Sequence, residues 1–204
     1  MNTRRSNVLP LLYLFTMLFI VGFSGHPVQA TTWIISETSP TISQIVQIAS
    51  AGDTLLLMHG TYYDQVFVDR PLTIASQYLF THDSTDAIST IITIPDSIRI
   101  DSTRSRSPFE IRDVNAIRFV GITVENGLGT PHIFYGTTPM MAGGAIFSLN
   151  SNLTLQNCRI RTSSAQRGCG VLAYWGNIRI EDCRFEFCWY DGPCSGGGAY
   201  LKGD

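Results

Sequence analysis

Apolar and polar positions alternate over short segments in the second half of the chain, and the same pattern occurs there twice. Residues 143–160 are followed by a second copy at 168–185, so equivalent positions lie 25 residues apart, and a third copy begins at residue 196. A repeat of this length, built from short alternating segments and glycine turns, indicates a solenoid of stacked coils. The alternation predicts which apolar side chains point into its core: Leu153, Leu155, Ile178 and Ile180.

Upstream of the repeats, the spacing of apolar residues predicts one short helix. Apolar residues recur at helical spacing from Ile42 to Ala49. Ser39 is a suitable N-cap, and Pro40 suits the first turn of a helix. We therefore predict one amphipathic helix over residues 40–50.

Strands are predicted around this helix, because short apolar runs alternate there with turn residues. A strand at 31–36 precedes the helix. The strands that follow are expected to form one coil with turns at 59–62 and 69–71; they span residues 53–58, 66–68 and 72–75.

The middle of the chain continues the series less regularly. Further strands are expected at 90–94, 98–100, 109–111 and 117–124. The second of these strands is expected to point Ile98 and Ile100 inward and its charged neighbours outward. Long excursions from a solenoid tend to lie on one face, which is often the binding face. Two such excursions are expected, at residues 78–89 and 126–141.

Motifs at the start of the predicted solenoid resemble a known family. The motifs are GDTL at 52–55, GTY at 60–62 and PLTI at 71–74, together with the Gly-Gly-Ala copies from residue 143. They resemble the N-terminal portion of right-handed parallel β-helix proteins of the pectin lyase-like superfamily. The resemblance covers residues 32–204 and implies an all-β solenoid with a short N-terminal capping helix. His59 replaces a proline that is usual in the family, and Thr162-Ser163-Ser164 replaces a usual asparagine.

The first thirty residues predict a secretory signal peptide rather than part of the fold. Arg4 and Arg5 precede an apolar stretch at residues 8–23, and small residues near Ala30 form a plausible cleavage site. We therefore expect a signal peptide at 1–30 and one β-helix domain at 31–204. We therefore expect the protein to be secreted or attached to the cell surface, with no membrane span in the mature chain. Because Asp204 interrupts the third copy, we expect the chain to be the N-terminal part of a longer protein.

Composition narrows the choice of partners. The chain has 204 residues, of which 44% are hydrophobic and 15% charged, so its composition argues against disorder. No basic run exceeds the pair Arg4-Arg5, so no nucleic-acid partner is expected. The five cysteines all follow residue 157 and include no CxxC pair, so no metal site is predicted. Stacked cysteines would point the same way, which favours free thiols over disulfides, although the pairing is left open.

Two groups of residues are candidates for ligand binding. Arg159 and Arg184 lie 25 residues apart and are expected to be neighbours on successive coils, where they could meet an anionic glycan. Aromatic and acidic residues on predicted turns could stack on sugar rings and bond to hydroxyls: Trp175, Trp189, Tyr190 and Asp191. The alternative is that both groups are ordinary surface and packing residues.

Two functional hypotheses follow. The first is a glycan-binding or adhesin-like scaffold, because no catalytic constellation is visible and the catalytic residues stay unassigned. The second rests on the family resemblance, which implies a polysaccharide lyase or glycoside hydrolase with catalytic residues beyond residue 204. No cofactor is evident from the sequence, and calcium would be expected only if the enzyme hypothesis holds.

Overall fold

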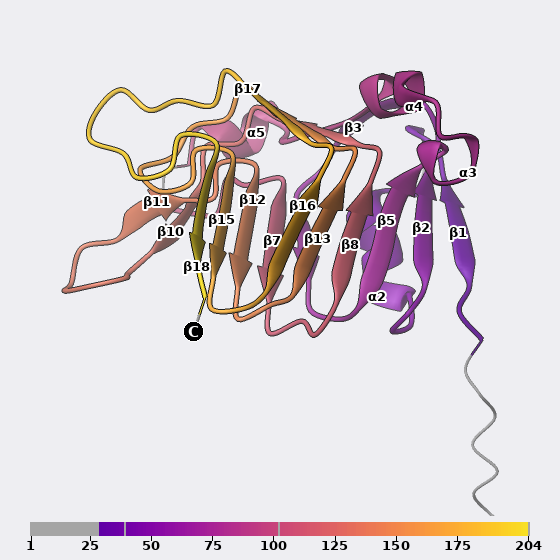
Figure 1. Ribbon diagram of the computed structural model, residues 1–204, viewed down its shortest axis with the longest axis horizontal. Coiled ribbons are helices and arrows are strands. Elements are labelled where there is room, and N and C mark those ends of the chain that lie inside the picture. The colour runs from indigo at the N-terminus through magenta and orange to yellow at the C-terminus, as the bar shows by residue number, and fades with distance from the viewer. Residues whose placement is uncertain (1–28, 39, 102, 204) are drawn as a thin grey trace, which may run out of the picture.

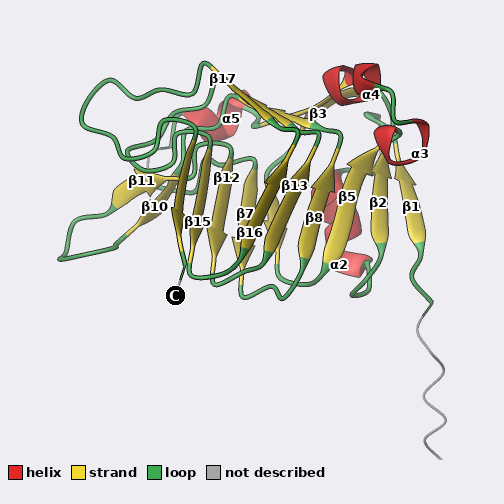
Figure 2. Ribbon diagram, in the orientation of Figure 1, coloured by secondary structure: helices red, strands yellow, loops and turns green. Residues whose placement is uncertain are grey.

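The computed structural model describes residues 29–38, 40–101 and 103–203; the predicted signal peptide lies almost entirely outside them. The chain is a right-handed parallel β-helix built from three parallel sheets (Figures 1 and 2). Sheet 1 contains β1 (Thr32–Ile35), β2 (Thr54–Leu57), β5 (Leu72–Ser76), β8 (Ile117–Val120), β13 (Leu153–Gln156) and β16 (Ile178–Glu181). Sheet 2 contains β3 (Gly60–Tyr63), β6 (Thr90–Thr93), β9 (Thr123–Glu125), β14 (Arg159–Arg161) and β17 (Arg184–Glu186). Sheet 3 contains β4 (Val66–Val68), β7 (Phe109–Arg112), β12 (Ile146–Leu149), β15 (Val171–Tyr174) and β18 (Ala199–Lys202).

Each coil passes through sheets 1, 2 and 3 in that order. Within the described residues the chain completes five coils, which we number from the N-terminus. Coil 1 is β2–β3–β4, coil 2 is β5–β6–β7, coil 3 is β8–β9–β12, coil 4 is β13–β14–β15 and coil 5 is β16–β17–β18.

The register confirms the repeat seen in the sequence. Leu153 pairs with Ile178 and Leu155 with Ile180, so equivalent residues of the two copies lie side by side. The two leucines are buried, and the two isoleucines pack against the same core from coil 5, where they are partly buried. The inward orientation predicted for all of them is therefore confirmed.

The predicted N-terminal helix is present as α2 (Ile42–Ile48), but its cap differs from the prediction. The N-cap is Thr41, because its hydroxyl accepts the backbone N–H of Gln44 at 3.2 Å. The Gln44 side chain in turn accepts the backbone N–H of Thr41 at 3.0 Å, which completes a capping box. Ser39 lies outside the described residues, and Pro40 precedes the cap. The apolar face of α2 packs into the main core.

The turn predicted at 59–62 is wrong, because this segment forms strand β3. Tyr62 anchors the strand: its side chain is buried, and its hydroxyl donates to the carbonyls of Ile35 and Met58, each at 2.8 Å. The predicted coil is therefore divided differently. Its third strand, β5, pairs with β2 and begins the next coil.

The strand predicted at 98–100 is also wrong, because residues Asp96–Arg99 form the short helix α5. This segment leaves the solenoid between β6 and β7 and has no neighbouring strand to pair with. Ile100 is consequently 86% exposed instead of pointing inward.

The long excursions lie at two corners rather than on one face, which corrects the expectation for residues 78–89 and 126–141. The first forms helices α3 (Tyr78–Thr81) and α4 (Ser84–Ser89), which lie where sheet 1 turns into sheet 2. The second contains the hairpin β10 (Thr130–His132)–β11 (Met140–Ala142), which lies where sheet 2 turns into sheet 3. Figure 1 shows the two excursions near opposite ends of the solenoid.

Candidate functional site

Arg159 and Arg184 are neighbours on the outside of sheet 2, as the sequence predicts. Their surroundings differ. Arg159 pairs with Glu186, with Nη2 2.8 Å from Oε2, so its charge is already compensated. Arg184 is exposed on coil 5. Two adjacent arginines are therefore present, but only one of them is without a carboxylate partner.

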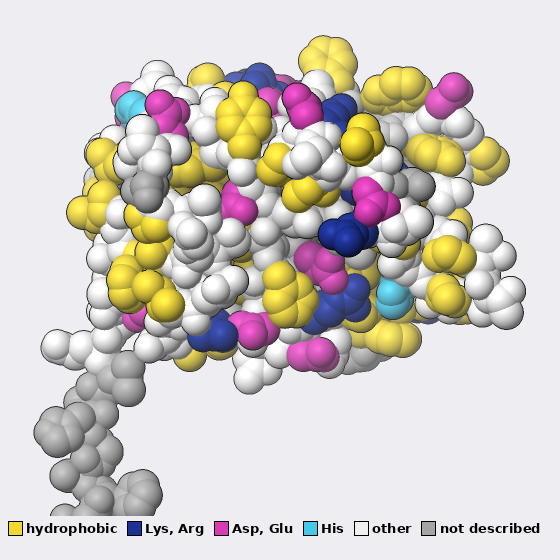
Figure 3. All heavy atoms as spheres, turned by 180° about the vertical axis from the view of Figure 1, so that it is seen from behind, with side chains coloured by type: hydrophobic (Ala, Val, Ile, Leu, Met, Phe, Trp, Pro, Cys, Tyr) yellow, Lys and Arg dark blue, Asp and Glu magenta, His cyan; other side chains and the backbone are white. Residues whose placement is uncertain are grey.

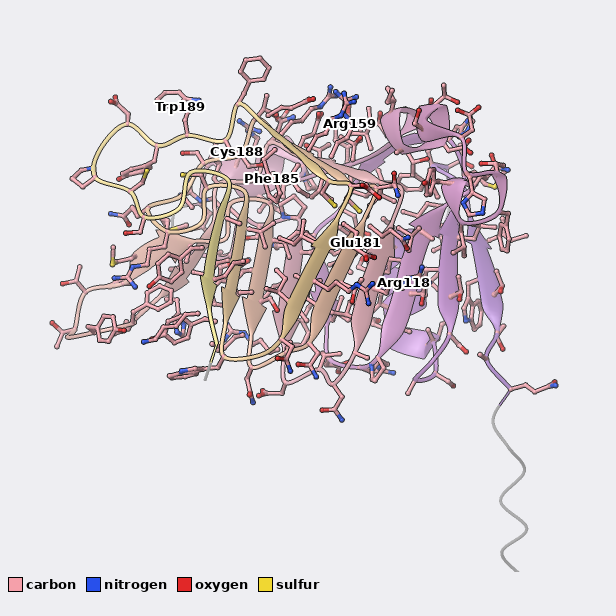
Figure 4. The ribbon with its side chains drawn as sticks, in the orientation of Figure 1. Arg118, Arg159, Glu181, Phe185, Cys188 and Trp189 are labelled. Atoms are coloured by element: carbon pink, nitrogen blue, oxygen red, sulfur yellow. The ribbon has the colours of Figure 1, made fainter. Side chains whose placement is uncertain are left out.

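The aromatic candidates occupy two other places. Trp175 follows β15 and packs on Tyr174, with ring centroids 4.6 Å apart, while 46% of its surface stays exposed. Trp189 lies on the loop between β17 and β18, together with Tyr190 and Asp191, and is 63% exposed. Figure 4 shows Trp189 on this loop, apart from Arg159. The structure therefore does not gather the predicted residues into one site.

A different cluster forms where the β10–β11 hairpin folds over the outside of sheet 3. Phe147 and Leu172 point outward from this sheet, yet both are fully buried. They are buried because a second apolar cluster covers them, in which Phe134 from the hairpin packs beside Tyr174 at 5.1 Å. His132 of the hairpin also packs on Phe147 at 5.4 Å. The hairpin thus turns an outer face of the solenoid into a small second core.

Arg167 lies at the edge of this second core and touches three aromatic rings. Its guanidinium carbon is 4.8 Å from the ring centre of Phe134, 5.5 Å from Tyr135 and 5.4 Å from Tyr200. Its Nε and Nη1 atoms are buried and have no hydrogen-bond partner. These two nitrogens are covered by the structure, and the guanidinium is held by contact with the surrounding aromatic rings.

Lys202 lies next to the same rings and binds two tyrosine hydroxyls. Its Nζ donates to Tyr135 at 2.9 Å and to Tyr174 at 3.3 Å, and the two hydroxyls lie 3.1 Å apart. Hydrogen bonding to Tyr135, followed by Tyr174, raises the pKa of Lys202 to about 12, so the ammonium is charged at neutral pH. The hydrogen bond from Lys202, followed by that of Tyr174, lowers the pKa of Tyr135. We call Phe134, Tyr135, Arg167, Tyr174, Tyr200 and Lys202 the aromatic–cationic cluster.

Neither cation of the cluster is neutralised by an acidic side chain. Among the described residues, the arginines that pair with carboxylates are Arg70, Arg104, Arg112, Arg159, Arg161 and Arg179. Arg167 and Lys202 form no such pair. Glu110 lies on the same outer row of sheet 3, but it pairs with Arg112 at 2.6 Å. The cluster therefore carries uncompensated positive charge beside exposed aromatic surface.

Charge is distributed differently elsewhere. On the face seen in Figure 3, basic side chains lie beside acidic ones and form no continuous basic surface of the kind that binds phosphate backbones. Within the described ranges, no group of three or more His, Cys, Asp or Glu side chains is placed to hold a metal ion. In the same part of the chain, no helix is long and apolar enough to cross a membrane.

Comparison with known proteins finds solved structures that align with part of the chain. No protein-family model and no curated protein matches the chain. Among solved structures, the PL6 family alginate lyase AlyGC, in a mutant form, aligns with a TM-score of 0.49 and 17% identity over 78% of this chain and 20% of its own. A pectin methylesterase from Aspergillus niger, in deglycosylated form, aligns with a TM-score of 0.46 and 17% identity over 78% of this chain and 57% of its own.

The chain thus spans less than two thirds of the solved structures that it matches. Its three stacked parallel sheets define the class as a right-handed parallel β-helix protein. What the chain does has to be argued from its own side chains.

Proposed function

We propose that the protein is a secreted or cell-surface carbohydrate-binding β-helix module and that the aromatic–cationic cluster binds an anionic polysaccharide. The observation that carries the proposal is the state of Arg167. Arg167 is partly exposed, its guanidinium contacts three aromatic rings, and none of the described carboxylates pairs with it. A carboxylate or sulfate on a sugar would supply the missing anionic partner in a charge-assisted bond.

The surroundings of Arg167 fit a sugar ligand. Tyr135 is 64% exposed and presents its ring next to both cations, and Trp175, which is 46% exposed, packs on Tyr174 of the cluster. Aromatic rings pack against the apolar faces of sugars, while hydroxyl groups such as those of Tyr135 and Tyr174 hydrogen-bond to sugar hydroxyls. Lys202 adds a second positive charge within the same hydrogen-bonded group.

The proposal is tested by affinity electrophoresis of the purified chain in gels that contain polygalacturonate, alginate or neutral dextran. We expect retardation by the anionic polymers, no retardation by dextran, and weakening by added salt. Arg167→Ala and Lys202→Ala should each weaken binding about tenfold, because a hydrogen bond to a charged group contributes about 1.5–3 kcal/mol. Arg179→Ala is the matched control, since that arginine is largely exposed on sheet 1 and pairs with Glu181.

Two results would contradict the proposal. If the folded chain binds none of the anionic polymers, the carbohydrate-binding function is wrong. If the chain binds them but Arg167→Ala and Arg179→Ala behave alike, the binding site lies elsewhere on the solenoid.

A catalytic function is the second candidate, and the state of Tyr135 favours it. A tyrosine whose pKa is lowered by a neighbouring ammonium is suited to move a proton. If the chain is a lyase, incubation with uronate polymers should produce unsaturated products with ultraviolet absorbance, and Tyr135→Phe should abolish these products while weakening binding only slightly, because the ring remains. The assay is run with and without calcium. If no products form under either condition while binding is intact, the catalytic function is wrong and only the binding function is supported.

A further inference from the structure

A groove of about 620 Å³ lies between α4 and the turns that join sheet 1 to sheet 2 in coils 4 and 5. Each of these turns contributes an Asx residue, a cysteine and an arginine to the lining. The two triplets are Asn157-Cys158-Arg159 and Asp182-Cys183-Arg184. The groove is separate from the aromatic–cationic cluster, which lies on sheet 3.

The groove exists because helices α3 and α4 cover the turn of coil 3 but do not extend over the turns of coils 4 and 5. At the equivalent turn of coil 3, a Cβ on Gly121 would lie 2.3 Å from the Tyr78 side chain, so α3 packs directly on the glycine. Thr123 donates to the carbonyl of Ala87 in α4 at 2.6 Å. The turns of coils 4 and 5 carry larger side chains and are not covered in this way, so their cysteines border open space.

The two cysteines of the groove are in contact. Arg159 pairs with Arg184 in the register, so Cys158 and Cys183, which directly precede these two residues, lie side by side on adjacent coils, about 4.8 Å apart at the backbone, a separation that a disulfide can span. The backbone N–H of Cys158 donates to Cys183 Sγ at 3.4 Å, whereas the Cys158 thiol donates to the carbonyl of Gln156 at 3.4 Å. Cys158 is buried, whereas Cys183 is partly exposed.

The surroundings make the two thiols unequal. The hydrogen bond from Cys158 lowers the pKa of Cys183, against burial and the nearby charge of Asp182. Burial raises the pKa of Cys158 well above its usual value. Since the thiolate is the reactive form, Cys183 is the better nucleophile and Cys158 the thiol that keeps its proton. Arg184 adds positive charge to the same groove.

We propose that Cys183 and Cys158 form a peroxide-reactive dithiol, in which Cys183 attacks a hydroperoxide that enters the groove and Cys158 closes a disulfide between coils 4 and 5. In the first step the Cys183 thiolate forms an S–O bond as the peroxide O–O bond breaks. The sulfur loses two electrons, and the departing oxygen takes up a proton and leaves as water or an alcohol.

In the second step the Cys158 sulfur attacks the sulfenic acid on Cys183. An S–S bond forms, the S–O bond breaks, and the departing hydroxide leaves as water with the proton of the Cys158 thiol. With hydrogen peroxide, two thiols and one peroxide therefore give one disulfide and two waters.

Cys169 and Cys194 provide a matched internal control. They have the same 25-residue spacing, and the Cys169 thiol donates to the carbonyl of Ala165 at 3.1 Å. However, neither residue lines the groove, and burial raises the pKa of Cys169. This pair therefore has the spacing of the proposed dithiol and one exposed thiol, Cys194, but it lies outside the groove.

The test is to reduce the full chain, treat it with stoichiometric hydrogen peroxide, block free thiols with iodoacetamide and map tryptic peptides by mass spectrometry. Trypsin separates the two proposed partners from each other and from the other cysteines: Cys158 falls in residues 119–159, Cys183 in 180–184 and Cys169 in 168–179, while Cys188 and Cys194 share 185–202 and are told apart by fragmentation of that peptide. We expect the peptides 119–159 and 180–184 to become linked before any other pair. In Cys158→Ser, Cys183 should stop at the sulfenic acid and be trapped by dimedone.

The control is the double variant Cys169→Ser/Cys194→Ser, which should form the 158–183 link at the wild-type rate. Preferential oxidation of Cys169, Cys188 or Cys194 in the wild-type chain would overturn the proposal. Dimedone labelling of Cys158 in Cys183→Ser, without labelling of Cys183 in Cys158→Ser, would overturn the assigned roles. Should a variant fail to fold, the order of oxidation in the wild-type chain decides the question alone.

Discussion

Single residues decide where the cluster of cations and rings forms. Arg167 lies in bridge contacts between Ala142 and Ser195, at a position where each neighbouring coil carries a small residue. The repeat has a small residue at this position on the coils before and after, so the arginine breaks the pattern, and this break can be read from the sequence. Lys202 is likewise the single lysine of the chain. These two signals were available in the sequence, but only the folded hairpin shows that both residues meet the same aromatic rings.

A second effect at the residue scale concerns the second residue of each copy, which is Gly144 in the first copy, Cys169 in the second and Gly197 in the third. A Cβ on Gly144 would lie 1.8 Å from the carbonyl oxygen of Cys169 on the next coil, so only glycine fits there. The equivalent residue of coil 5, Gly197, has nothing closer than 3.8 Å to such a Cβ. Stacking is therefore closest at coils 3 and 4, where backbone lies directly against backbone.

We predict that Gly144→Ala lowers the free energy of unfolding by about 1–3 kcal/mol, because the added methyl group forces the backbone of coil 4 to move. Gly197→Ala is the matched control and should change stability by less than about 0.5 kcal/mol. Urea denaturation followed by circular dichroism measures both. Equal effects of the two substitutions would mean that the close approach at coil 4 is not what requires glycine.

At the scale of elements, a buried carboxylate joins the N-terminal strand to the end of α2. Asp53 accepts hydrogen bonds from the backbone of Thr31 at 2.7 Å, the indole of Trp33 at 2.9 Å and the backbone of Ser50 at 2.8 Å. The Thr31 bond is the largest cause of the lowered pKa of Asp53, followed by those from Trp33 and Ser50. One aspartate thus fixes β1, the residue after the helix, and the start of β2.

The lowered pKa of Asp53 gives a prediction for stability against pH. The stabilisation is fully present above the ordinary pKa of 3.8 and is lost as the pH falls through the lower value in the fold. Asp53→Asn should therefore lower the melting temperature at pH 7, and the difference from the wild type should shrink below pH 3.8. Thermal melts across this range measure it. A constant difference at all pH values would contradict the assigned role of the charge.

Elements also show the limits of prediction from sequence. The repeat at 143–185 fixes both the register and the inward face, because the copies can be aligned on each other. Residues 59–62 and 98–100 lack such copies, and three or four residues are too few to separate a strand from a turn or a helix by periodicity. The neighbouring positions of Arg159 and Arg184 on sheet 2 were predictable because both arginines occupy equivalent positions in the two copies. The hairpin contacts were not, since no periodic signal says onto which face a loop will fold.

At the scale of the whole molecule, each coil is stabilised by the coils beside it, so the cost of a cavity depends on the position of the coil. Leu155 and Ile180 are register partners in coils 4 and 5. Leu155 is 0% exposed, whereas Ile180 is partly buried. The same truncation therefore has different consequences at two equivalent positions.

We predict that Leu155→Ala lowers the free energy of unfolding by about 2–5 kcal/mol, the usual cost of truncating a fully buried leucine. Ile180→Ala should lower it clearly less, because its side chain already contacts solvent. Ile180→Asp should cost more than Ile180→Ala, since it places a charge against the core. Urea titrations of the three variants test this order. An Ile180→Asp variant as stable as the wild type would contradict the inward orientation of Ile180.

The positions of the cluster residues link ligand occupancy to the dynamics of the last coil. Tyr135 comes from the excursion of coil 3, Arg167 leads into β15 of coil 4, and Lys202 belongs to β18 of coil 5. A polysaccharide bound by both Arg167 and Lys202 would link coil 4 to coil 5. Opening of β18 would then require release of the ligand, so occupancy should slow amide hydrogen exchange in β18 while leaving the distant strands β1 and β2 unchanged.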